Sequence, residues 1–385
     1  MSPHSQAGIV YLDHNATTPI TPEVLDAMLP YLRDQFGNPS SDHVLGRRAH
    51  KAVETARAQV ADLIGAAPHE IVFTSGGTES NNLAVRGVAA SARPDRRRII
   101  TSAVEHPAIV GPCGVLTVEG WDVTRVPVTR EGVVEAETVI AALGPDVALL
   151  TLMRAQNETG ALMPVGEVAA AARAAGVVVH SDAAQAVGKV AVDVGDLGVD
   201  LLSIAGHKLY APKGVGALYI RAGTPIKTIN FGAGQERGLR PGTENVAGIV
   251  GLGAAAARAQ GSLADESVRQ RALREALWEN LTSRIPGLVR HTPDGPSLPN
   301  TLAFSFPSVL GKDVLAVADG VLASTGSACH AGVDTPAETL LTMGVPPSVA
   351  LGSVRLSLGR STTADELAVA ANMLVAAYIS VSGHR

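Results

Sequence analysis

The sequence predicts an α/β protein built on a mostly parallel sheet. Short apolar runs typical of strands alternate with helical stretches between residues 70 and 251. Such alternation produces parallel strands covered by helices on both faces, and ligands then bind at the carboxyl ends of the strands. The pattern changes after about residue 255, and 385 residues are too many for one compact core. A second, smaller α+β domain is therefore expected.

The apolar runs give the order of the elements. Strands are expected at residues 71–74, 99–101, 123–128, 147–153, 176–182, 201–204 and 215–220, with helices from about Thr78 and after His106. In the smaller unit, leucines at helical spacing predict a helix at 265–284. Beyond a loop at 291–300, strands are expected at 301–306 and 354–358, and helices at 312–322 and from Ala364.

Composition excludes several classes of protein. A hydrophobic content of 46% and a charged content of 17% are typical of a well-buried globular enzyme. The net charge of −5 does not indicate the basic surface that binds nucleic acid. The amino terminus lacks the features of a signal peptide, and no apolar stretch is expected to reach membrane-spanning length. We therefore expect a cytoplasmic protein that binds neither membrane nor nucleic acid.

Lys208 and Asp182 are the first candidates for chemistry. Asp182 ends an apolar strand, and Lys208 follows the next strand in a glycine-containing turn. A lysine in a tight site can form a Schiff base with an aldehyde cofactor, and an aspartate can keep a pyridinium nitrogen protonated. Pyridoxal phosphate (PLP) requires this pair. Taken singly, such an aspartate is usually a helix cap and such a lysine a solvated charge, so the hypothesis depends on the other motifs.

Residues 74–82 join a strand to a helix through two glycines, and they predict a phosphate site. Backbone amides that are exposed by glycine at a helix amino terminus bind anions. Gly77 and Thr78 stand at that position, and Thr78 adds a hydroxyl group. An ordinary strand-to-helix turn is the alternative.

Four further side chains are candidates. His106 follows a strand and could stack on a planar cofactor or move protons, although a lone histidine is more often a cap. Cys329 lies in a loop of small residues, which favours a reactive thiol over a structural one. Cys113 is expected to be structural, in a turn. Arg355 on a strand could clamp a substrate carboxylate, with a surface ion pair as the alternative. Two cysteines without a CxxC spacing predict no metal site.

Together these residues resemble the NifS/IscS-type cysteine desulfurases, which are class V, fold type I PLP enzymes. The resemblance runs nearly end to end, over segments 11–19, 36–41, 74–82, 157–160, 180–185, 206–208, 240–245, 326–329 and 355–360. It implies a large PLP-binding domain (residues 16–256) with a mostly parallel seven-stranded sheet. It also implies a small α+β domain (residues 1–15 and 257–385) that carries a mobile cysteine loop.

The resemblance implies a role for each site residue. Lys208 would carry the cofactor, Asp182 would pair with its pyridine nitrogen, and Cys329 would take the sulfur. The other cofactor contacts would be His106 on the ring face, Gln185 and Asn157 at the ring oxygen, and Gly77, Thr78, His207 and Thr243 of the partner subunit at the phosphate. The substrate would be held by Asn38, Asn157 and Arg355.

The implied activity converts L-cysteine to L-alanine, with a persulfide on Cys329 that passes to a sulfur-acceptor protein. The acceptor could serve iron–sulfur cluster assembly, tRNA thiolation or biosynthesis, and the enzyme would be a homodimer. Ala205 and Gln156 depart from the family's usual Ser and Asn, and His330 after the cysteine is similar to selenocysteine lyases. A selenocysteine lyase is therefore the nearest alternative. An aminotransferase and a non-catalytic binding protein are the others.

Overall fold

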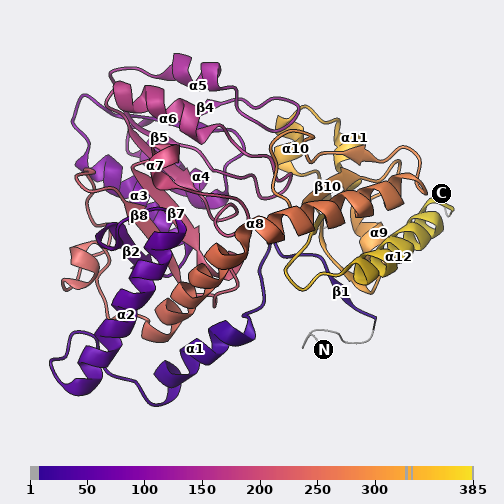
Figure 1. The fold of residues 1–385 in the computed structure, drawn as a ribbon. Helices are drawn as coiled ribbons and strands as arrows, with labels where there is room; N and C mark the ends of the chain where they lie inside the picture. Colours follow the sequence, from indigo (N-terminus) through magenta and orange to yellow (C-terminus); the bar gives the residue numbers. More distant parts are fainter. Residues whose placement is uncertain (1–7, 326–327, 331–332, 384–385) are drawn as a thin grey trace.

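The computed structural model describes residues 8–325, 328–330 and 333–383, without the side chains of residues 326–334. Two lobes are joined by one long helix, α8 (Val246–Thr282), which runs from the larger lobe to the smaller (Figure 1). The predicted boundary after residue 256 falls inside this helix, so the division into domains stays a prediction.

The larger lobe contains the seven-stranded sheet that the resemblance implied, which is thereby confirmed. In spatial order its strands are β2 (Ile71–Thr74), β8 (Gly216–Ile220), β7 (Leu201–Ala205), β6 (Val178–Asp182), β5 (Val147–Thr151), β3 (Arg98–Ser102) and β4 (Asp122–Val126). Only β8 runs antiparallel to its neighbours among the strands of this sheet. The carboxyl ends of β5, β6 and β7 therefore meet at one edge.

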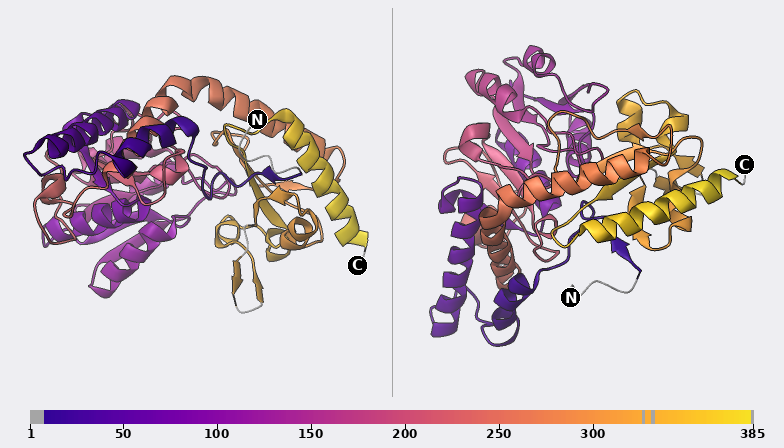
Figure 2. Two further views of the ribbon diagram at one scale, coloured as in Figure 1. Left: turned by 90° about the horizontal axis from the view of Figure 1, so that it is seen from below. Right: turned by 45° about the vertical axis from the view of Figure 1, so that its right-hand side comes forward.

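Helices cover both faces of the large sheet (Figures 1 and 2). They are α1 (Pro22–Arg33), α2 (Val44–Leu63), α3 (Gly77–Ser91), α4 (Pro107–Val118), α5 (Ala136–Ala142), α6 (Val165–Ala174) and α7 (Val194–Leu197), with 3-10 turns at Pro68–Glu70, Gly206–Lys208 and Gln235–Gly238. Ile71 and Phe73 of β2 face one hydrophobic core, and Val72 faces the other. This alternation follows from the two-residue repeat of a strand.

The smaller lobe has its own sheet and core. An antiparallel sheet is formed by β12 (Ser324–Thr325), β15 (Ser353–Ser357), β10 (Thr301–Ser305) and β9 (Val289–Arg290), and β1 (Val10–Tyr11) pairs with β11 (Val321–Leu322). Its helices are α9 (Gly311–Val317), α10 (Glu338–Thr342), α11 (Pro347–Ala350) and α12 (Ala364–Gly383). A hairpin of β13 (Ala328–His330) and β14 (Val333–Thr335) extends away from this sheet (Figure 2).

Three predicted elements were wrong in extent or type. The helix expected at 265–284 begins nearly twenty residues earlier, at Val246. The helix expected to reach residue 322 ends at Val317, because Val321 and Leu322 pair with the amino-terminal strand. Cys113 lies within α4 rather than in a turn. Apart from these three, the backbone around Cys329, which was expected to be a loop, pairs as a hairpin over the residues that the structure describes.

The expectation that no apolar stretch reaches membrane-spanning length was also wrong. Helix α12 is long and apolar enough by those two criteria. Its buried residues, among them Leu367, Leu374 and Val375, pack into the core of the smaller lobe. A core helix that passes the same test is common, so α12 is weak support for a membrane span.

Candidate active site

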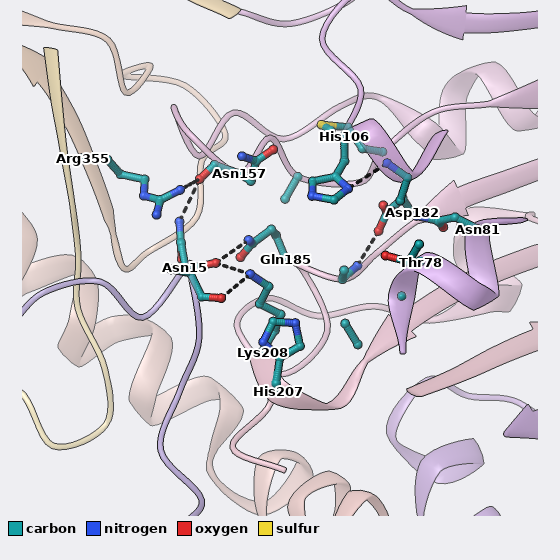
Figure 3. Close-up of a pocket in the computed structure, with 17 residues that line it drawn as sticks. Asn15, Thr78, Asn81, His106, Asn157, Asp182, Gln185, His207, Lys208 and Arg355 are labelled. Atoms are coloured by element: carbon teal, nitrogen blue, oxygen red, sulfur yellow. Dashed lines mark hydrogen bonds between the residues drawn. The ribbon is translucent and has the colours of Figure 1, made fainter. Parts of the chain in front are cut away.

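A cavity of about 360 Å³ opens where the carboxyl ends of the central strands meet the amino terminus of α3. Its volume is within the range of small-molecule sites. The cavity is lined by nine of the residues predicted from the sequence, namely Gly77, Thr78, His106, Asn157, Asp182, Gln185, His207, Lys208 and Arg355 (Figure 3). Arg355 comes from the smaller lobe, so the site lies between the two sheets.

Asp182 ends β6 and is held by two donors. The Ala184 backbone N–H donates to Oδ1 across 2.9 Å, and the Asn81 side chain donates to Oδ2 across 2.6 Å. These two hydrogen bonds fix the orientation of the carboxylate at the end of the strand. An anionic oxygen at a strand end can hold a protonated ring nitrogen.

Lys208 follows β7 in a 3-10 turn, and its ammonium group donates to the backbone oxygens of Asn15 and Ala16, the latter across 2.8 Å. Burial and the neighbouring Arg355 lower the pKa of Lys208 to about 8, although Asp13 and Asp182 oppose that shift. A larger share of the amine is then neutral near pH 8 than in a solvated lysine. A neutral amine is the form that adds to an aldehyde or removes a proton.

His106 caps the amino terminus of α4, because its Nδ1 accepts a 3.1 Å hydrogen bond from the Ala108 backbone N–H. Burial lowers the pKa of His106, as does Lys208, while Asp182 raises it. The neutral ring therefore carries its proton on Nε2. The capping role is therefore confirmed and the ring lines the cavity, while stacking on a cofactor and proton transfer stay predictions.

The opposite end of the cavity is suited to an anion. Helix α3 begins at Gly77, and Gly76 has a φ of 145°, a conformation that favours glycine. A Cβ at Gly77 would lie 3.2 Å from the Cβ of Ala205, so the backbone of Gly77 comes close to the end of β7. His207 also lines the cavity. Burial and nearby lysines lower the pKa of His207 to about 4, which leaves the ring neutral at pH 7.

Arg355 is buried in β15 and is not a surface residue. It donates to Oδ1 of Asp13 across 2.7 Å and to the backbone oxygen of Asn157 across 3.0 Å. Its Nε is buried without a hydrogen-bond partner. An N–H group of this kind can bind a carboxylate, and the role of Arg355 in holding the substrate stays a prediction.

Two predicted site residues that the structure describes, Asn38 and Thr243, do not line this cavity. Asn38 is exposed in the loop between α1 and α2, and its Oδ1 accepts from the Ser40 backbone N–H. Thr243 is exposed after the 3-10 turn at Gln235–Gly238. The backbone of Cys329 pairs with Asp334 in the hairpin, whereas its side chain lies outside the described residues. The roles of these residues stay predictions.

Sequence reasoning missed two polar residues that line the cavity. Asn15 is 1% exposed, and all of its backbone and side-chain polar groups are hydrogen bonded. Asn81 holds Asp182. Both lie inside segments that carry the resemblance, at 11–19 and 74–82. Their segments could therefore have drawn attention to them, but only the fold shows what they contact.

Comparison with known proteins agrees with this geometry. Residues 10–369 match the family model of the class-V aminotransferases. The chain is 46% identical over 360 residues to a cysteine desulfurase IscS from Dictyoglomus turgidum, covering 93% of this chain and 91% of that protein. It is 44% identical to the cysteine desulfurase NifS from Azotobacter vinelandii, covering 93% and 90%. A solved NifS-like protein superposes with a TM-score of 0.90 at 37% identity, covering 96% and 98%.

The fold and the match over nearly the whole chain define the class: this protein belongs to the class-V aminotransferase family. Within that family it belongs with the cysteine desulfurases, and it is an enzyme of this type. The family is PLP-dependent in general. The chemistry of the cavity fits that cofactor. A lysine of lowered pKa, a carboxylate that accepts two hydrogen bonds and a helix amino terminus surround one space of suitable size.

Proposed function

We propose that this chain binds PLP through Lys208 and transfers sulfur from L-cysteine to Cys329. The observation that carries the proposal is the single cavity shared by Lys208, Asp182 and Arg355. When bound, PLP supplies an electron sink for the carbanion formed at the substrate α-carbon. Asp182 would keep the ring nitrogen protonated, and Gly77, Thr78 and His207 would bind the phosphate. Gln185 and Asn157 would contact the ring oxygen.

The chain's own groups would perform the remaining steps. Arg355, with Asn38 and Asn157, would bind the substrate carboxylate and orient the α-proton toward the site. Nζ of Lys208 would remove that proton, because its lowered pKa leaves part of the amine neutral. His106 would stack on the ring and move protons through Nε2.

Cys329 would act as the nucleophile. Its thiolate attacks the substrate sulfur, so an S–S bond forms as the C–S bond breaks, and the carbon takes a proton to become alanine. The persulfide on Cys329 then passes to an acceptor protein. The hairpin that carries Cys329 extends from the smaller lobe, which suits delivery to a partner (Figure 2). The acceptor's pathway and a cytoplasmic location stay predictions.

We propose further that the enzyme is a homodimer in which Thr243 contributes to the partner's phosphate site. Thr243 is exposed and outside its own cavity, as that role requires. Arg240 fixes the segment by an ion pair with Glu79 across 3.1 Å. Light scattering should give a dimer, and Thr243→Ala should weaken cofactor binding. An active monomer would contradict this proposal.

The experiment that tests the function has two parts. Borohydride reduction of the yellow protein should fix PLP on the peptide containing Lys208, and label on another lysine would reject that assignment. Incubation with L-cysteine should add one sulfur atom to the peptide containing Cys329, as mass spectrometry would show. Turnover of L-selenocysteine by the same preparation would separate the lyase alternative, which predicts that selenocysteine is much the better substrate.

A further inference from the structure

Lys189 lies behind the wall of the active-site cavity. It does not line that cavity, but its Nζ donates to Oε1 of Gln185 across 2.7 Å and to Oδ1 of Asn15 across 2.9 Å. Both acceptors are neutral amide oxygens. The charged groups that act on Lys189 are Lys208 and Arg355, which are both cations.

The surroundings of Lys189 disfavour the charged form of a lysine. Burial and the two cations lower the pKa of Lys189 well below its usual value. An apolar side chain would avoid that desolvation. The contacts of Nζ therefore call for an explanation, and both protonation states of the amine can supply the two N–H groups that they need.

The orientation of the Gln185 amide explains the contacts of Lys189 Nζ. Its Nε2 donates to the backbone oxygen of Asn15 across 2.9 Å, and that oxygen also accepts from Lys208. The two ends of an amide have nearly the same shape, so the neighbours decide which end points where. Lys189 presents N–H groups on one side, and the Asn15 carbonyl presents an acceptor on the other. Together they keep the oxygen away from the cavity and the NH₂ group beside it.

Asn15 extends this arrangement to the smaller lobe. Its Oδ1 accepts from Nδ2 of Asn300 across 3.1 Å as well as from Lys189, and its own Nδ2 donates to Oγ1 of Thr301 across 2.8 Å. Because Asn15 is fixed on all sides, its backbone oxygen is a rigid reference point for Gln185 and Lys208.

We infer that Lys189 is a positioning residue for the cofactor: it fixes the Gln185 amide so that an N–H group, and not a carbonyl oxygen, faces the ring oxygen of bound PLP. The inference rests on the function proposed above. An N–H donated to that oxygen stabilises its negative charge. The pKa of the cofactor–lysine linkage, which is read from its visible absorption, is thereby lowered.

A matched pair of variants tests this inference. Lys189→Met and Lys189→Gln have similar length, but only the second keeps an N–H donor. In the holoenzyme, Lys189→Met should raise the pKa of the visible absorption band by about one unit and weaken PLP binding about tenfold. Lys189→Gln should stay closer to the original protein in both. Equal values for the Met variant and the original protein would overturn the inference.

A double variant shows whether Lys189 acts through Gln185. In a Gln185→Ala background, Lys189→Met should shift the pKa of the band little, because no amide remains to be oriented. A full shift in that background would overturn the inference. Gln185→Met alone should raise the pKa of the band by about one unit. An unchanged pKa in this variant would also overturn the inference, and this test remains even if Lys189→Met fails to fold. Failure of the proposed function would instead show in the original protein, as absence of PLP on Lys208.

Discussion

Asn81 donates a 2.6 Å hydrogen bond from Nδ2 to Oδ2 of Asp182, and the two residues come from segments about a hundred positions apart. Helix α3 thus contributes twice to the cavity: its amino terminus faces the predicted phosphate position, and Asn81 at the start of its second turn holds the carboxylate. The two ends of a bound cofactor would be fixed by one rigid element. Any displacement of α3 would disturb both.

Asn81→Ala should therefore weaken PLP binding about tenfold, because a charge-assisted hydrogen bond contributes about 1.5–3 kcal/mol. A fluorescence titration of the cofactor-free protein would measure the change. Asn82→Ala is the matched control, since Asn82 donates only to the Thr78 backbone oxygen and does not line the cavity. Equal affinities for the two variants would show that Asn81 does not support Asp182.

Attachment of PLP should depend on pH with a midpoint near 8, which is the lowered pKa of Lys208. The rate of cofactor uptake should rise through this midpoint, because only the neutral amine reacts with an aldehyde. Arg355→Gln removes a nearby positive charge, so the pKa of Lys208 and the midpoint should both move upward. Stopped-flow absorbance over pH 6–10 (about the accessible range) would record both proteins. A midpoint that stayed in place or fell would contradict this role of Arg355.

The sequence was sufficient where one local pattern determines one element. Strand β2 was predicted with its observed bounds, because three apolar residues and a threonine shortly precede the pair of glycines at 76 and 77. The positions of Asp182 and Lys208 at strand ends followed from the same reasoning. A parallel sheet then places both at one edge, as the cavity confirms.

The sequence was insufficient where distant contacts decide. The start of α8 contains glycines, which disfavour helix, but a Cβ at Gly251 or Gly253 would meet Met28 or Ala56 within 2.7 Å. Close helix packing thus needs these glycines and overrides propensity. Helix α4 is a similar case, because it continues through Pro112, a residue that disfavours the interior of a helix. The burial of Cys113 in a hydrophobic core stabilises the helix at this point.

Arg57 and Glu236 form a buried ion pair across 2.7 Å, with side chains 7% and 3% exposed. Glu236 has a φ of 47°, which is unusual for a residue other than glycine, and its carboxylate also accepts from the Phe73 backbone N–H. Arg57→Met should lower the free energy of unfolding by about 3–5 kcal/mol, because it leaves a buried charge unpaired.

Urea unfolding would measure this loss against Arg93→Met. Arg93 pairs with Asp95 at an exposed position, where side chains are 72% and 60% exposed, so its loss should cost less than about 1 kcal/mol. Similar losses of unfolding free energy in the two variants would contradict this prediction. They would mean that Glu236 gains water or pairs with another group.

Cys329→Ala should separate cofactor binding from sulfur transfer. The variant should keep the visible absorption of bound PLP and still respond to L-cysteine, because Lys208, Asp182 and Arg355 are unchanged. It should release alanine at least about a hundredfold more slowly, because no thiolate remains to attack the substrate sulfur. Alanine formation by amino-acid analysis and sulfide release would measure this loss.

Cys113→Ala is the matched control for the second thiol. Cys113 is 1% exposed in α4, and burial raises the pKa of its thiol to about 11, so it stays protonated at neutral pH. The change should cost about 1 kcal/mol of stability through lost packing and leave turnover intact. If Cys113→Ala lost turnover while Cys329→Ala kept full activity, the assignment of the nucleophile to Cys329 would be wrong. If Cys329→Ala lost cysteine turnover but kept selenocysteine turnover, the lyase function would be favoured, since a selenol leaves more readily than a thiol.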